Sequence, residues 1–260
     1  GLAPLHSWLP DAHSESPSVV SALMSGALLN VAFLGILRMY QVSLAAGEGA
    51  FARSLLVDFG LLSMAVAAVF MIGQRDYKRM LAYSSVEHMG ILALGIGIGG
   101  AAAFGSMFHA VNHSLAKGLL FLIAGNVLAV YRTTSVRGVR GMLKVLPVSG
   151  PLWILGFLAI TGSPPFGSFS SEFTILQATL ASGHVVVAVL YLGLLGIVFI
   201  GMSRSVLSMA QGDPWAQPSQ PKREAVLAVA PPALLAGGAL LTGLYLPPSL
   251  EQALRGAAAL

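Results

Sequence analysis

Two histidines and a lysine recur at intervals of four residues inside an apolar stretch of the chain: His109, His113 and Lys117. On an α-helix this spacing places the three side chains on one face, drifting about 40° over the two steps. If the helix crosses a bilayer, a lysine at its centre costs roughly 2.5–3.5 kcal/mol, so a partner or a hydrated cavity is expected. Imidazole titrates near neutrality. We therefore favour a proton relay over helix-joining histidines and a lysine that reaches the membrane surface.

A metal site is the competing interpretation of the same residues, because His-x-x-x-His on one helix is a zinc-ligand spacing. However, no third ligand lies nearby in the sequence, and Lys117 is a poor neighbour for a divalent cation. A haem held by these two histidines is disfavoured too, since axial ligands approach the iron from opposite faces. We predict no metal site and no cofactor bound by this chain.

Glu172 follows a Gly- and Pro-rich hexapeptide at 162–167 (GSPPFG). The two prolines remove backbone donors and the glycines relax the chain, so a helix is expected to break there. Such breaks offer free carbonyl and amide groups to water or ions. Glu172 fits a proton-exchanging site, which we favour, and also the ordinary start of a second half-helix, where an acid complements the dipole.

Four further residues and one segment carry weaker signals. Glu87 and His88 open a predicted span, as a relay pair or as a pair at the membrane surface, and both interpretations stay open. Asn30 is more typical of a hydrogen bond between helices, and Asp58 of a helix cap. The polar segment 5–17, with two histidines and two acids, is either an interfacial loop or a proton entry point.

The composition requires a membrane to hold these residues. Of the 260 residues 56% are hydrophobic and only 9% are charged, where a soluble domain has roughly 25% charged residues. The mean hydropathy is +0.81. These values predict an all-α polytopic membrane protein and exclude a disordered chain, a nucleic-acid binder and a disulfide-stapled secreted domain. The absence of cysteine removes disulfides and thiolate-ligated metal or iron–sulfur sites.

Seven apolar stretches are long enough for membrane-spanning helices, which need about 20 residues. The fifth contains the hexapeptide and is expected to be broken at mid-membrane depth. The stretches are 18–39, 54–73, 80–99, 102–131, 148–182, 184–203 and 225–246.

Lys and Arg are distributed unevenly between the two sets of connecting segments. One set holds ten of them, whereas the other holds only Arg38, Arg53 and Arg255. The positive-inside rule then places the segment before residue 18 and the loop 211–223 in the cytoplasm, and the C-terminus outside. The ten are Arg75, Lys78, Arg79, Arg132, Arg137, Arg140, Lys144, Arg204, Lys222 and Arg223.

Four stretches resemble a known family, the antiporter-like, proton-translocating membrane subunits of respiratory complex I, Mrp antiporters and membrane-bound hydrogenases. They are 4–13 (PLHSWLPDAH), 76–85 (DYKRMLAYSS), 108–125 (FHAVNHSLAKGLLFLIAG) and 162–172 (GSPPFGSFSSE). Their order and combination are specific and cover roughly residues 1–180. The variants SVEHMG and PDAHSE are most similar to the hydrogenase-4 component F type.

The resemblance implies protons moving along charged residues at mid-membrane depth, through two broken helices. By position, Lys117 is similar to the family's central lysine, with His109 and His113 beside it. Glu172 is similar to the charged residue after the second break. Asn30 departs from the pattern, because several complex I relatives carry lysine there, so this station holds no charge.

The resemblance also implies how the chain is organised. The family's glutamate and the lysine of its first broken helix would lie before Gly1. We therefore expect residues 1–260 to form a single transmembrane domain, the C-terminal part of an antiporter-like subunit whose N-terminal helices are missing.

We expect a proton-translocating subunit of a redox-driven complex, of the hydrogenase-4, formate hydrogenlyase or NADH:quinone oxidoreductase type, in a bacterial or archaeal inner membrane. Moving one charge against 100 mV costs roughly 2.3 kcal/mol. Nothing in the sequence supplies that energy, so the expected partners are other membrane subunits and a peripheral redox module. Two alternatives stay open: a subunit of a Na⁺/H⁺ antiporter, and a structural membrane arm that does not pump.

Overall fold

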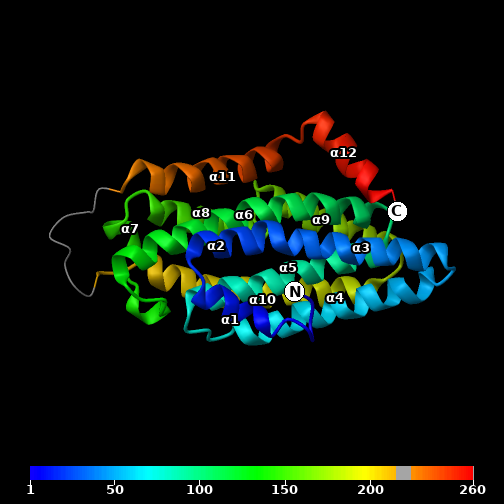
Figure 1. Cartoon of the computed structure of the whole chain (residues 1–260), viewed down its shortest axis with the longest axis horizontal. Coiled ribbons are helices and arrows are strands. Elements are labelled where there is room, and N and C mark those ends of the chain that lie inside the picture. The colour runs from blue at the N-terminus through cyan, green and yellow to red at the C-terminus, as the bar shows by residue number, and fades with distance from the viewer. Residues whose placement is uncertain (215–223, 260) are drawn as a thin grey trace.

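The computed structural model describes residues 1–214 and 224–259, and every regular element in this part of the chain is helical. The helices form an elongated bundle in which most of them run back and forth along the long axis (Figure 1). Six segments are long and apolar enough to cross a membrane. The predicted all-α polytopic architecture is therefore confirmed.

These six segments match six of the seven predicted stretches. The first of them is interrupted by one π-helical turn, η1 (Met24–Leu28), where the backbone widens between α2 and α3. The spans are α2 (Ser18–Leu23) continued through η1 into α3 (Leu29–Ala45), α4 (Gly49–Met71), α5 (Tyr77–Ile98), α6 (Ala101–Tyr131), α10 (Val185–Ala210) and α11 (Val226–Leu244).

The remaining predicted stretch, 148–182, is a broken helix, as expected. It consists of α8 (Ser149–Ile160) and α9 (Gly167–Ala181), joined by residues 161–166. Gly162 has φ +61°, a left-handed conformation that ends α8 and that glycine adopts without steric cost. The two prolines that follow have no amide hydrogens to continue the helix.

The remaining helices are short and lie outside these spans. The opening segment 5–17, for which an interfacial loop and a proton entry point were both open, contains the helix α1, so the loop interpretation was wrong. The short helices are α1 (Trp8–Glu15), the 3₁₀ turn η2 (Val136–Gly138), α7 (Met142–Val145) and α12 (Pro248–Ala258).

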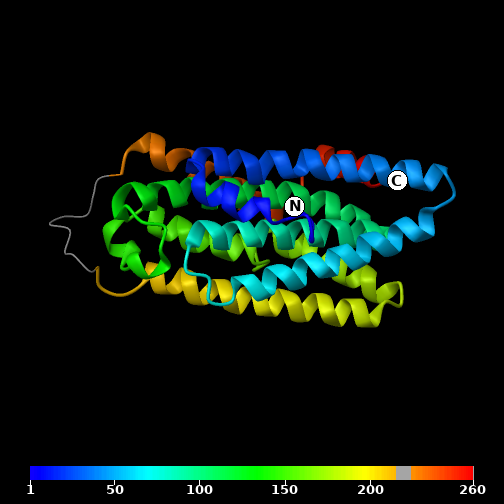
Figure 2. The same ribbon diagram turned by 60° about the horizontal axis from the view of Figure 1, so that its bottom comes forward.

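The two ends of the bundle differ in charge. The α4–α5 turn, the connection from α6 to α8 and the last turn of α10 lie at one end, and the connection from α3 to α4 and the helix α12 lie toward the other (Figures 1 and 2). Arg38 belongs to α3, Arg53 to the start of α4 and Arg255 to α12. The membrane orientation itself stays a prediction, and the predicted loop 211–223 lies mostly outside the described residues. Asp58 is not a helix cap; it lies inside α4 on an exposed face.

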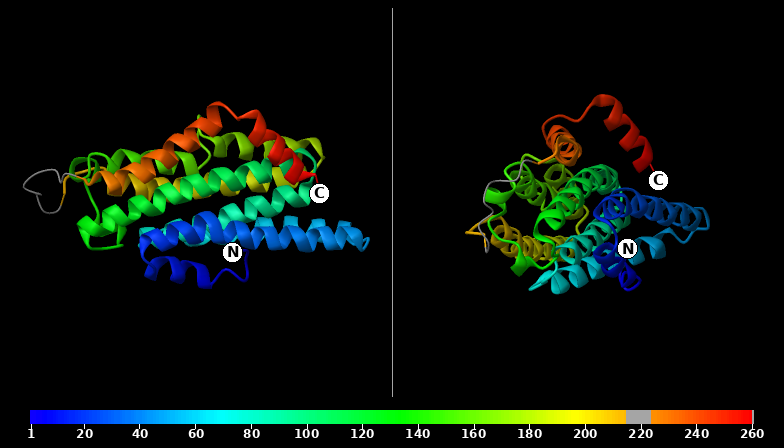
Figure 3. Two further views of the ribbon diagram at one scale, coloured as in Figure 1. Left: turned by 45° about the horizontal axis from the view of Figure 1, so that its top comes forward. Right: turned by 60° about the vertical axis from the view of Figure 1, so that its left-hand side comes forward.

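α5 and α6 form the centre of the bundle. α5 is buried along nearly its whole length and packs against α1, α4, α6 and α9. α6 in turn contacts α2, α8, α9, α11 and α12, and the oblique view toward one end of the bundle shows it among the other helices (Figure 3, right). Side chains on the facing surfaces of α5 and α6 are therefore removed from lipid and water.

Candidate functional site

The predicted face of α6 turns into the middle of the bundle. His109, His113 and Lys117 each have 0% of their surface exposed. An ammonium group that is fully buried does not reach the membrane surface, which excludes that interpretation of Lys117. Lys117 and His109 instead form hydrogen bonds with groups on α5 and α9, whereas His113 contacts the ring of His88 and neither of its ring nitrogens has a hydrogen-bond partner among the described residues.

Lys117 is held by α5. Its Nζ donates to the backbone carbonyl of Leu81, at 2.7 Å, and to Ser84 Oγ, at 2.5 Å. Both acceptors are neutral. Glu87 lies one turn further along α5, is only 2% exposed, and interacts electrostatically with Lys117. A buried cation with two dipolar acceptors and a carboxylate close by has the partners that the membrane interior demands.

A row of histidines continues from Lys117 toward α9. The ring centres of His113 and His88 are 5.2 Å apart, and His88 Nδ1 lies 2.8 Å from His109 Nε2. The other ring nitrogen of His109, Nδ1, is 2.9 Å from Ser171 Oγ. Because each imidazole has two nitrogens on opposite sides of the ring, a proton accepted on one can be matched by release from the other.

Glu172 lies at the far end of this row, in the first turns of α9. It is 7% exposed, and its Oε1 has no hydrogen-bond partner among the described residues. The carboxylate lies against Gly162, where an added Cβ would overlap it. The broken helix thus serves the site twice, because α9 carries Glu172 and the glycine in the break leaves room for its carboxylate.

Replacing Gly162 by Ala is expected to destabilise the protein and displace the carboxylate of Glu172. A left-handed alanine costs about 1–2 kcal/mol before the overlap is counted. The midpoint of thermal unfolding in detergent measures this loss. The matched control is Gly193→Ala on α10, where an added Cβ meets nothing within 4 Å. A Gly162→Ala protein as stable as the Gly193→Ala protein would contradict the assigned role of Gly162.

Three of these groups also come within reach of one metal ion. One ligand atom each from His88, His109 and Glu172 lie within 4.8 Å of one another. However, the direct His88–His109 hydrogen bond occupies a lone pair that a metal would need, and the ammonium of Lys117 shares the same buried region. The donor set as arranged suits proton sharing better than metal binding.

The family model described as "NADH:quinone oxidoreductase/Mrp antiporter, TM" matches residues 1–199 of the chain, a span that contains the whole row from Lys117 to Glu172. The chain belongs to this family.

The similar proteins in this family come from different complexes. A hydrogenase-4 component F homolog from Methylacidiphilum infernorum is 40% identical over 97% of the chain and 52% of that protein. In the structure of respiratory complex I from Thermus thermophilus, the similar chain is 28% identical, with a TM-score of 0.83 over 99% of this chain and 54% of its own. The Mrp complex from Dietzia sp. contains a similar fold at 21% identity, TM-score 0.86, covering 99% and 56%. The chain spans about half the length of each.

The six predicted site residues, four of which the family resemblance also covers, lie close together in the structure, although their roles stay predictions. Glu87 and His88 lie in the middle of α5 and are buried, so the surface-pair interpretation was wrong. Asn30 on α3 donates to Ser114 Oγ on α6 at 2.6 Å, which confirms the hydrogen bond expected between helices.

Sequence reasoning missed the hydroxyl groups that complete this antiporter-family site. The only signal for these two serines was their position in the sequence. Ser84 lies about one helical turn before Glu87, and Ser171 directly precedes Glu172. It also left His13 undecided between a loop and an entry point. His13 is fully buried, stacks on Phe121 with ring centres 4.7 Å apart, and has no hydrogen-bond partner among the described residues for either ring nitrogen.

Proposed function

We propose that this chain translocates protons as a membrane subunit of a redox-driven complex of the hydrogenase-4, formate hydrogenlyase or NADH:quinone oxidoreductase type. The observation that carries the proposal is the buried row in which the His88–His109 pair and Ser171 lie between Lys117 and Glu172. Its relatives include subunits of hydrogenase-4 and of respiratory complex I.

In this mechanism Lys117 holds a proton near the middle of the membrane, with Ser84 and the Leu81 carbonyl solvating the ammonium. The histidines pass a proton along the row by exchanging which ring nitrogen carries it. Glu172 accepts the proton at the break, where its carboxylate lies against Gly162 and its Oε1 has no hydrogen-bond partner among the described residues. The same groups can pass the proton in the opposite order, from Glu172 to Lys117. The direction of proton transfer is therefore set by the partner that supplies the energy.

The driving energy comes from outside the chain. Moving one proton against 100 mV costs about 2.3 kcal/mol. The row contains protonatable groups but no cysteine, so an iron–sulfur cluster with thiolate ligands is not available to it. We therefore assign the redox step to a peripheral module and place other membrane subunits between that module and this chain.

His109→Gln is expected to lower proton translocation at least tenfold, because glutamine keeps one hydrogen bond at this position but cannot take up and release a proton (one tenfold step corresponds to about 1.4 kcal/mol). The measurement is acidification of sealed vesicles that contain the assembled complex of full-length subunits, with electron transfer followed in parallel. His184→Gln, in the exposed turn before α10, is the matched control. Wild-type translocation by a correctly assembled His109→Gln complex would refute the relay.

Sodium/proton exchange is the second candidate. The unpartnered Oε1 of Glu172 beside the broken backbone favours it, since carboxylate and carbonyl oxygens suit a hard cation as well as a proton. Uptake of radioactive sodium by the same vesicles distinguishes the two. Sodium uptake that depends on Glu172 would favour the antiporter, and proton movement unaffected by sodium would favour the relay.

A further inference from the structure

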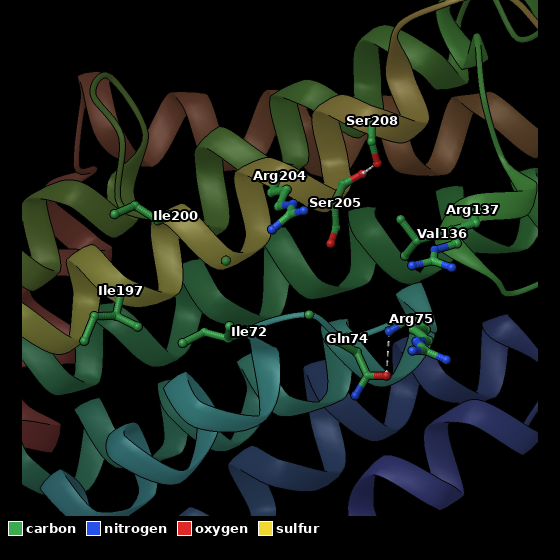
Figure 4. Close-up of a pocket in the computed structure, with 12 residues that line it drawn as sticks. Ile72, Gln74, Arg75, Val136, Arg137, Ile197, Ile200, Arg204, Ser205 and Ser208 are labelled. Atoms are coloured by element: carbon green, nitrogen blue, oxygen red, sulfur yellow. Dashed lines mark hydrogen bonds between the residues drawn. The ribbon is translucent and has the colours of Figure 1, made fainter.

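A pocket of about 540 Å³ lies at the end of the bundle where the arginines gather, away from the row of histidines. Three elements enclose it: the turn between α4 and α5, the segment around η2, and the last turns of α10 (Figure 4). Arginine side chains from all three elements line it, namely Arg75, Arg137 and Arg204.

The backbone holds two of these arginines close together. The amide of Val136 donates to the carbonyl of Arg75 at 2.8 Å, which joins the α4–α5 turn to the first residue of η2. On the other wall, α10 approaches the end of α4 closely at Gly201, where an added Cβ would lie 3.7 Å from the Met71 carbonyl. The pocket is therefore built by main-chain contacts between the three elements.

The pocket is polar on one side and apolar on the other. Ile72, Ile197 and Ile200 line one side, whereas Arg204 and Ser208 follow one and two turns further along α10 (Figure 4). An α-helix rises 1.5 Å per residue, so the α10 residues from Ile197 to Ser208 span about 16 Å. This order runs from the apolar middle of a span to its charged end, which is the order of acyl chain and headgroup in a lipid leaflet.

Three of the described acidic groups at this end of the bundle have other partners. Asp76 accepts from the backbone amide of Arg79, Asp213 pairs with Lys144, and Glu224 accepts from the amide of Ser149. Among the described residues, Arg75 and Arg204 form no ion pair. The two guanidinium groups therefore bring positive charge to the pocket without a carboxylate in direct contact among the described residues.

We propose that this pocket binds the phosphate-bearing headgroup of an anionic phospholipid, with its acyl chains along the isoleucine side. Guanidinium groups bind phosphate oxygens through paired hydrogen bonds. Basic pockets between spans, at the membrane surface, select anionic lipids by the same chemistry. The site is separate from the proposed proton route.

The test uses the full-length natural protein in detergent, titrated with dioleoyl phosphatidylglycerol, with bound lipid counted by native mass spectrometry. Each arginine near an anionic lipid contributes about fivefold in affinity, so Arg75→Gln with Arg204→Gln is expected to weaken binding about 25-fold. Arg75→Lys with Arg204→Lys should restore most of it. The matched control, Arg38→Gln with Arg53→Gln, removes the same charge from two exposed arginines toward the other end.

Three further arms separate the sources of binding. Phosphatidylcholine should bind equally weakly to all variants, and glycerol 3-phosphate should not compete at the concentration at which the lipid saturates. Unchanged phosphatidylglycerol binding by the glutamine variant, once size-exclusion and thermal unfolding show that it is folded, would overturn the proposal. Equal competition by glycerol 3-phosphate would overturn it in favour of a soluble phosphate ligand. Loss of bound lipid on assembly of the complex would overturn it in favour of a partner subunit.

Discussion

Lys117→Ala is expected to lower proton translocation by the assembled complex about 100-fold while electron transfer continues. Without the ammonium group, a proton that reaches Ser84 or His113 has no charged station in the centre of the bundle. A cation in that environment without its partners costs roughly 2.5–3.5 kcal/mol, which corresponds to about two tenfold steps. The initial rate of acidification of sealed vesicles measures the loss.

Two companion variants make this result interpretable. Lys117→Met keeps the side-chain volume and is expected to pump as poorly as Lys117→Ala, which separates the lost charge from a packing defect. Lys144→Ala removes an exposed lysine that pairs with Asp213 at the bundle end and should pump normally. If the Lys117→Met complex assembles and pumps at the wild-type rate, Lys117 is a structural residue and the non-pumping alternative gains support.

Glu172→Gln is the second large effect, with translocation expected to fall at least tenfold. The amide fits the space beside Gly162 but cannot exchange a proton, so the row ends at Ser171 and His109. The loss is expected to be smaller than at Lys117, because the broken backbone next to Glu172 still offers polar groups to water. The rate of acidification and the rate of electron transfer are compared in the same vesicles.

Glu251→Gln is the control for this substitution, since Glu251 is paired with Arg255 on the short helix α12. This substitution removes the same charge from a residue that is not part of the row, so translocation should stay unchanged. If the Glu172→Gln variant gives a lower yield of assembled complex, but each assembled complex translocates protons at the wild-type rate, Glu172 has a structural role and is not part of the proton route.

The polar face of α6 and the break before α9 were predictable because both depend on local sequence. A period of four residues defines the face containing His109, His113 and Lys117, and two adjacent prolines define the break. Strong hydropathy likewise gave the spans, with boundaries shifted by a few residues. Glu87 and His88 were described as opening a span, but α5 runs from Tyr77 to Ile98 and both residues lie in its middle.

The contacts between helices were not predictable from one sequence. The His88–His109 hydrogen bond joins two helices, and the bond from His109 to Ser171 reaches a third. Neither follows from periodicity, because both depend on how α5, α6 and α9 rotate against one another. Lys78 shows the same limit. It was counted among loop cations, but it is buried and donates to the carbonyls of Ser14 and Ser16 at the end of α1.

The most direct test of a continuous proton route is a comparison of Lys117→Ala, Glu172→Gln and the double variant in one vesicle assay. Groups on a single path act in series, so removing the second should add little once the first is lost; independent sites add within about 0.3–0.5 kcal/mol. We predict that the double variant pumps as slowly as Lys117→Ala alone. A double variant in which the two losses multiply would contradict a single route from Lys117 through the histidines to Glu172.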